Sequence, residues 1–121
     1  MEWKFDESRS IWQQIREQIS RRILSGEFES GERLPSVREL AADAGVNPNT
    51  MQRALLSLDD TGLTTADRTK GRIVTASEEK LAKVRRELAG GYAREYLGQI
   101  RELNMDANSA VKILKEESEN E

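Results

Sequence analysis

The chain of 121 residues contains no cysteine and no histidine. Without cysteine there can be no disulfide and no thiolate metal site. Without histidine the commonest general base near neutral pH is missing, and a transition-metal site would need oxygen ligands alone. Asp59 and Asp60 are neighbours in sequence only, so we expect both to be solvated. No GxxxxGK[ST] phosphate loop occurs either. The sequence therefore argues against an enzyme, a metal site and a bound cofactor.

Long hydrophobic runs are also absent. No apolar stretch approaches the roughly 18 residues that a membrane-spanning helix requires, and the opening MEWKFDESRS is acidic, unlike a signal sequence. We therefore expect a soluble, cytoplasmic protein without a membrane partner. Apolar residues make up 36% of the chain, which is enough for one small domain with a modest core and an appendage.

The most informative stretch runs from Leu34 to Leu63 and contains signals for two short helices. Ser36 can cap the first helix, and Gly45 supplies the left-handed residue that ends it. Asn47 can cap the second helix, with a proline at its first position. So short a turn forces the helices to cross steeply, which predicts a helix-turn-helix whose second helix can enter a DNA major groove. An ordinary helical hairpin is the alternative.

A predicted β-hairpin follows in the segment from Thr64 to Ala76. Two β-favouring runs flank the turn residues of Asp67-Arg68-Thr69-Lys70-Gly71. Cations at Arg68, Lys70 and Arg72 suit phosphates or the minor groove beside a recognition helix. A helix-turn-helix followed by a basic hairpin is a winged helix. The alternative is a solvated hairpin with incidental charges.

The remaining residues of the first half should complete this domain. Glu2 to Asp6 alternate in character and could form a short strand against the wing. Isoleucines recur every four residues from Ile11 to Ile23, which predicts a first helix. Phe28 and Leu34 are expected in the core. Four apolar residues of the predicted recognition helix are also assigned to the core: Met51, Ala54, Leu55 and Leu58.

A long helix is predicted from about Glu78 to Leu103, followed by a second helix capped by Asp106. Their apolar stripe is wider than one small domain can cover, so we expect the two helices to pack against the same pair of another subunit. A self-contained hairpin is the alternative. Gly90-Gly91 and Gly98 interrupt the long helix, which indicates close helix packing or a hinge. The predicted dimer residues are Leu81, Val84, Leu88, Tyr92, Tyr96, Ile100, Leu103, Val111 and Leu114.

Four segments between Ile11 and Val74 follow one another at tight spacing: a helix with IWQQI, then SGEFESGERLPSVRELA, then GVNPNT, then the hairpin. In this order they resemble the GntR-type bacterial transcription regulators. The short remainder resembles the YtrA-type branch, in which a helical pair replaces a large effector domain. The resemblance implies base contacts by Arg38 and the region of Gln52, a minor-groove approach by the wing glycine, Gly71, and control of a neighbouring transporter operon. Other branches carry arginine where this chain has Pro48 and Gln52, so the preferred operator bases stay open.

The formal net charge of −3 is unusual for a DNA-binding protein, whose domain is ordinarily basic. Affinity must therefore come from the local placement of cations, donors and helix N-termini. Arg38 could instead pair with Glu39 or Asp43, and Gln52 and Arg53 could lie on a solvated helix face. The predicted DNA-binding residues are Ser36, Arg38, Asn47, Asn49, Thr50, Gln52, Arg53, Lys70, Gly71 and Arg72.

Together these features predict a mainly α-helical protein with a small β wing. Residues 1–77 should form a winged helix-turn-helix DNA-binding domain, and residues 78–121 a helical hairpin for dimerisation with a frayed tail. We expect a homodimeric transcription regulator, a repressor that occupies a palindromic operator in double-stranded DNA. The alternatives are a winged-helix module for protein assembly or RNA binding, and an accessory subunit of an enzyme. A small-molecule effector could bind near Tyr92 and Tyr96, although aromatic residues there are more often core.

Overall fold

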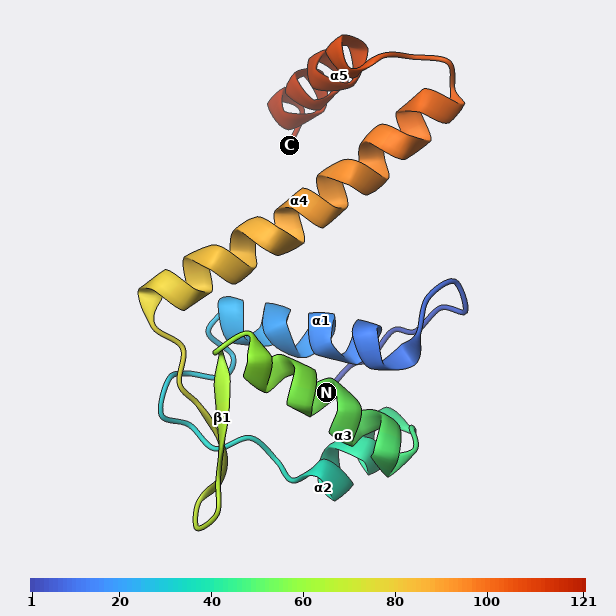
Figure 1. Ribbon diagram of the computed structural model, residues 1–121. Coiled ribbons are helices and arrows are strands. Elements are labelled where there is room, and N and C mark those ends of the chain that lie inside the picture. The colour runs from blue at the N-terminus through green and yellow to red at the C-terminus, as the bar shows by residue number, and fades with distance from the viewer. The chain divides into compact units, whose positions relative to one another are not determined.

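The computed structural model describes residues 1–121 and contains five helices and one two-stranded sheet (Figure 1). The elements in chain order are α1 (Ile11–Leu24), α2 (Val37–Ala44), α3 (Pro48–Asp60), β1 (Thr64–Asp67), β2 (Gly71–Val74), α4 (Glu78–Glu102) and α5 (Ala107–Glu119). The chain divides into two compact units, Met1–Arg85 and Arg86–Glu121, which are described separately. None of the helices combines the length and the apolar character that crossing a membrane requires.

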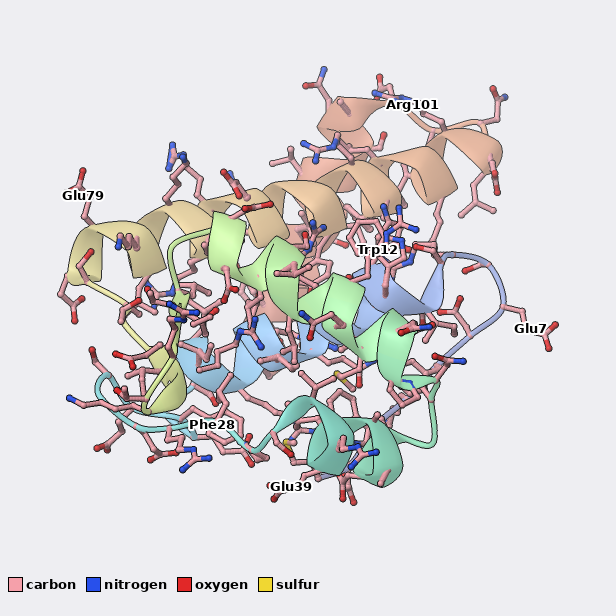
Figure 2. All side chains as sticks on the ribbon, turned by 60° about the horizontal axis from the view of Figure 1, so that its bottom comes forward. Glu7, Trp12, Phe28, Glu39, Glu79 and Arg101 are labelled. Atoms are coloured by element: carbon pink, nitrogen blue, oxygen red, sulfur yellow. The ribbon has the colours of Figure 1, made fainter.

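The core of the first unit lies where α3 packs against α1 and α2. The isoleucine stripe of α1 is buried as predicted at Ile15, Ile19 and Ile23. Leu34 is also buried, whereas Phe28, in the loop after α1, is only half-buried (Figure 2). The predicted core of α3 is confirmed, because its four assigned residues are at most 1% exposed: Met51, Ala54, Leu55 and Leu58.

The helix-turn-helix has its caps at the predicted residues, Ser36 and Gly45 of α2 and Asn47 of α3. The Ser36 hydroxyl accepts a hydrogen bond from the Glu39 amide at 3.1 Å, and the Asn47 side chain accepts one from the Asn49 amide at 2.7 Å. Gly45 ends α2 with φ of 70°, a left-handed conformation that costs glycine nothing because it has no Cβ. These caps fix where α3 starts.

The wing is a short antiparallel hairpin in which Thr64 pairs with Val74 and Asp67 with Gly71. Its tip projects beyond the helices of the same unit (Figure 1). Asp67 holds the tip together, because its carboxylate accepts hydrogen bonds from the Thr69 amide at 2.8 Å, the Thr69 hydroxyl at 2.7 Å and the Lys70 amide at 3.0 Å. These bonds lower the pKa of Asp67 below its usual value of 3.8.

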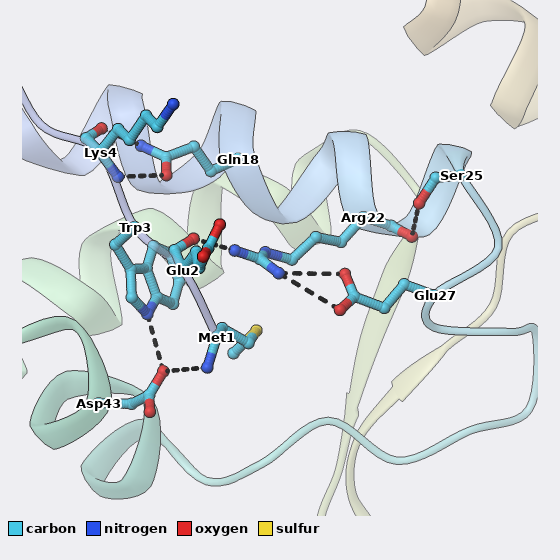
Figure 3. Close-up of polar contacts among 9 residues, drawn as sticks. All are labelled: Met1, Glu2, Trp3, Lys4, Gln18, Arg22, Ser25, Glu27 and Asp43. Carbon is cyan, nitrogen blue, oxygen red and sulfur yellow. Dashed lines mark hydrogen bonds and ion pairs between the residues drawn. The ribbon is translucent and has the colours of Figure 1, made fainter.

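The prediction that Glu2 to Asp6 form a strand against the wing is wrong. An isolated bridge between Arg33 and Ile73 lies at the wing instead, and the N-terminal residues run along α1. The Gln18 side chain accepts a hydrogen bond from the Lys4 amide at 3.1 Å (Figure 3) and donates one to the Lys4 carbonyl at 2.7 Å. Gln14 makes the same pair of bonds with Asp6. The segment is extended because buried glutamine side chains satisfy its backbone groups, which a residue pattern does not reveal.

Asp59 is not solvated as expected. Its carboxylate accepts two hydrogen bonds from Arg72, both at 2.9 Å, and one from the Thr64 hydroxyl at 2.6 Å. The side chains of Arg72 and Asp59 are only 10% and 21% exposed. This ion pair therefore fastens the wing to the last turn of α3.

The second unit is a helical hairpin, as predicted. Asn104, with φ of 62°, lies in the turn, and the Asp106 side chain caps α5 by accepting from the Ser109 amide at 2.9 Å. Tyr96 of α4 donates its hydroxyl to the Ala110 carbonyl of α5 at 2.8 Å. Ile100 and Ala110 are buried. The hydrogen bond from Tyr96 therefore joins α4 to α5.

The prediction of a frayed tail is wrong, whereas the close packing expected at the glycines of α4 stays a prediction because it can involve another subunit. α5 continues to Glu119, so the tail expected to fray is helical almost to its end. α4 is a continuous helix through Gly90 and Gly91, and a Cβ at Gly90 would meet only Arg94 of the same helix, at 3.4 Å. A Cβ at Gly98 would meet open space. Close packing of these glycines against the chain's own helices is therefore not observed.

Removing the Asp59 carboxylate should destabilise the first unit. Asp59→Ala leaves the half-buried Arg72 and the buried Thr64 without their acceptor, and we expect the free energy of unfolding to fall by roughly 1–3 kcal/mol. Urea denaturation measures this. The neighbouring Asp60→Ala is the matched control and should change stability by no more than about 0.5 kcal/mol, because Asp60 is exposed. Equal losses in the two variants would refute a structural role for the ion pair.

The wing tip should loosen in acid. Because the folded pKa of Asp67 lies below the unfolded value, its contribution to wing stability is present above the unfolded value and is lost as the pH falls through the folded one. NMR titration should show the Thr69 and Lys70 amide resonances moving with a midpoint below 3.8. Asp67→Asn should abolish this transition, and a midpoint above 3.8 would contradict the hydrogen-bonded tip.

Candidate nucleic-acid interface

The first turns of α3 present a polar face to solvent. Asn49, Gln52 and Arg53 are exposed, and Thr50 is half-buried. They are exposed because Met51 and the apolar residues at helical spacing after it occupy the opposite, buried face. The cap at Asn47 keeps the start of the helix, with its amide groups, at the surface. This face carries amide, hydroxyl and guanidinium groups, the donor and acceptor types that read base edges.

Arg38 and Ser36 lie exposed at the start of α2. The predicted alternative for Arg38, an ion pair with Glu39 or Asp43, is not formed. Asp43 accepts instead from the Trp3 indole at 2.8 Å, and this bond, with a second from the N-terminal amino group, lowers the pKa of Asp43 (Figure 3). The Arg38 guanidinium is therefore available to a ligand in solution.

The wing brings a second exposed cationic group, because Arg68 and Lys70 lie at its tip. Gly71, which follows them, has φ of 80°, and a Cβ there would lie 3.1 Å from Nε of Arg33. Any other residue at this position would be strained and crowded. A cleft of about 250 Å³ is lined by residues 33–37 and by Ala66, Asp67, Gly71 and Arg72, so the base of the wing and the start of α2 border the same hollow.

Arg72 has a different role from the one expected of it. Both sides of its guanidinium fork are occupied by Asp59, and its side chain is largely buried. Its Nε and Nη2 form a fork that matches this one carboxylate, and the burial of the side chain leaves little of it for a phosphate. The cations of the wing that face solvent are Arg68 and Lys70. Arg72 belongs to the scaffold because the cross-strand register places it over the end of α3, which composition alone does not show.

Three residues near this surface were not among the predicted site residues: Trp12, Arg16 and Arg33. Arg33 lies exposed against the wing glycine. Arg16 and Arg53 both lie over the ring of Trp12, with guanidinium carbons 5.5 and 4.4 Å from the ring centroid. Only the four-residue spacing of Trp12 and Arg16 on one helix could have indicated part of this contact.

The predicted dimer residues separate into three groups by their exposure. Val84 and Ile100 are buried within the chain, so they belong to its own core rather than to an open surface. Leu81, Leu88 and Tyr96 are half-buried. Four others are large, apolar and exposed by 41–68%: Tyr92, Leu103, Val111 and Leu114. No group of three or more Asp or Glu side chains is arranged to hold a metal ion.

Comparison with known proteins agrees with this surface. Residues 11–74 match the family of bacterial regulatory proteins called the gntR family. The HTH-type transcriptional regulator YhcF of Bacillus subtilis is 30% identical over 115 residues, which cover 95% of each chain. The HTH-type transcriptional repressor YtrA of the same organism is 33% identical over 87 residues, 67% of each chain. A GntR family transcriptional regulator from Listeria monocytogenes has a similar structure, with a TM-score of 0.79, 29% identity and coverage of 93% of this chain and 98% of its own.

The family match covers more than half of the chain, and it coincides with the capped helix pair and the wing. The relatives are named as transcriptional regulators of the HTH type. The resemblance drawn from the sequence is thereby confirmed. The chain belongs to the GntR family of bacterial transcription regulators and is a DNA-binding regulator rather than an enzyme.

Proposed function

We propose that this protein is a homodimeric, cytoplasmic repressor that occupies a palindromic operator in double-stranded DNA. The observation that carries the proposal is the exposed polar start of α3 on the same compact unit as the exposed cationic wing tip. The repressor named YtrA, at 33% identity, supports the direction of regulation. The resemblance of this chain to the YtrA-type branch also favours control of the protein's own operon or of a neighbouring transporter operon.

We propose that α3 enters the major groove. Asn49 and Gln52 can pair with adenine through their side-chain amides, and Arg38 can pair with guanine through its free guanidinium. Ser36, Asn47 and Thr50 lie at or near the helix starts, where hydroxyls and backbone amides bind phosphates. These contacts fix the register of the helix on the duplex.

The wing then approaches the adjacent minor groove. Arg68 and Lys70 supply the charge, and Gly71 allows the backbone to turn sharply behind them. Two such units, one from each subunit, double the number of phosphate contacts. This doubling is how a chain with a net charge of −3 can still bind a polyanion.

Selection of bound genomic fragments by the purified protein, followed by gel shifts at low and high salt, tests the proposal. We expect a small set of fragments that share an inverted repeat, with affinity that falls steeply as salt rises. Fragments without a common sequence, or no shift at low salt, would reject operator recognition. Binding to RNA in place of duplex DNA would favour the RNA-binding alternative.

Arg38→Ala should weaken binding to the selected operator by roughly 1–3 kcal/mol and relax preference at one base pair, because it removes a bidentate contact. Fluorescence anisotropy over single-base operator variants measures both effects. Arg101→Ala, which removes an exposed cation from the last turn of α4, is the control and should preserve the base preference. An unchanged affinity in Arg38→Ala would remove this residue from the interface.

The second unit supports the dimer. Tyr92, Leu103, Val111 and Leu114 are exposed by 41%, 68%, 50% and 52%, a concentration of large apolar side chains on one small helical hairpin. Exposed apolar surface of this kind marks an interaction site. A second copy of the same hairpin supplies the complementary apolar face, and it brings two recognition helices to one palindrome.

Leu114→Asp should weaken the dimer. A carboxylate buried in an apolar interface without a partner raises the dissociation constant roughly tenfold or more, since about 1.4 kcal/mol suffices for a factor of ten. Sedimentation equilibrium measures the shift. Lys112→Ser, which changes an exposed polar residue of the same helix, is the control and should leave the dimer intact. A monomeric wild-type protein at all concentrations would contradict the proposed assembly.

A further inference from the structure

Trp12 joins α1 to the exposed face of α3. The guanidinium carbon of Arg53 lies 4.4 Å from the centre of its ring, and that of Arg16, one turn further along α1, lies 5.5 Å away. Arg16 is also tied to α3, because its Nη1 donates to the Ser57 hydroxyl at 2.9 Å. Trp12 projects from the first turn of α1 and is half-buried (Figure 2).

This arrangement places two positive charges beside one ring without a balancing carboxylate. None of the four ion pairs in the chain includes Arg16 or Arg53. The negative face of an indole attracts a guanidinium but does not neutralise it. Both guanidinium carbons lie within 5.5 Å of the same ring centre, so the two charges repel each other, and an anion bound near them would relieve the repulsion.

The position of Arg53 over the Trp12 ring also bears on which of its groups remain available. A guanidinium that lies on an aromatic face uses its π surface there and keeps its N–H donors in the plane of the group. Those donors match the oxygens of a phosphate. Because Trp12 belongs to α1, its contact holds the Arg53 guanidinium on the side of α3 that faces α1.

We propose that Trp12, Arg16 and Arg53 form a binding site for one phosphate of the DNA backbone, in which Trp12 is a positioning residue for Arg53. The inference rests on the proposed operator binding and adds a third contact region to α3 and the wing. It removes Arg53 from the residues that read bases. It also places a local cluster of positive charge in an acidic chain beside the helix that needs it.

A double-mutant cycle on operator affinity tests the positioning role. Arg53→Ala should weaken binding equally for all single-base operator variants and lower the salt slope by about one, as expected for a phosphate contact. Trp12→Leu should weaken binding by about three- to fivefold through loss of the cation–π contact. In the Arg53→Ala background the effect of Trp12→Leu should largely disappear, since there is no guanidinium left to position.

A second tryptophan provides a matched control. The guanidinium carbon of Arg22, a residue of α1, lies 5.4 Å from the centre of the Trp3 ring. Trp3 therefore makes the same kind of cation–π contact, but with an arginine outside α3. Trp3→Leu and Arg53→Ala should therefore be additive. Trp12→Phe retains an aromatic face and should bind DNA with an affinity between those of the wild type and Trp12→Leu; it replaces Trp12→Leu in the cycle if thermal denaturation shows that Trp12→Leu does not fold.

The outcomes separate this inference from the proposed function. Additive effects of Trp12 and Arg53, or a changed base preference in Arg53→Ala, would overturn the positioning role while operator binding by the wild type stands. A wild-type protein that binds no operator would end the proposed function itself. Coupling between Trp12 and Arg53, with an unchanged base preference, would establish the phosphate site.

Discussion

Met51, Leu55 and Leu58 fill the space between α3 and the rest of the first unit, and each is at most 1% exposed. Residues at helical spacing lie on one face of a helix. Because this apolar face of α3 is buried, the polar residues on the opposite face point to solvent. The caps at Ser36 and Asn47 and the left-handed Gly45 set the axial position of the helix start. The proposed interface for DNA is therefore a consequence of core packing, because the apolar contact decides which side chains of α3 face solvent.

Charged residues make up 34% of the chain, and where they lie matters more than their net charge. The net charge is −3, yet Arg38, Arg68, Lys70 and Arg53 have no carboxylate partner. Several acidic groups near them are occupied elsewhere: Asp59 binds Arg72, Asp43 accepts from Trp3, and Asp67 accepts from the wing backbone. Carboxylates bound in this way build the scaffold that holds the free cations outwards. An acidic protein can thus present a cationic surface.

The sequence predicted the helix pair and the wing because their signals are local. A capping side chain, a proline at the first helical position and turn residues at a hairpin tip all act over three or four residues. Long-range pairings were missed for the same reason. Whether Arg72 meets DNA or Asp59 depends on residues 13 positions apart, and the strand expected at Glu2 to Asp6 failed because Gln14 and Gln18 hold that backbone. The contact between Trp12 and Arg53, 41 residues apart, likewise needs the packed structure.

The central claim is that the exposed start of α3 and the wing tip meet the same duplex. Amide chemical-shift mapping of the full-length chain, titrated with an operator obtained by genomic selection, tests this most directly. The account predicts that the largest shifts fall in residues 47–53 and 68–71, with little change at the buried residues of α3. Shifts confined to the helical hairpin of the second unit, with none at the start of α3, would contradict it.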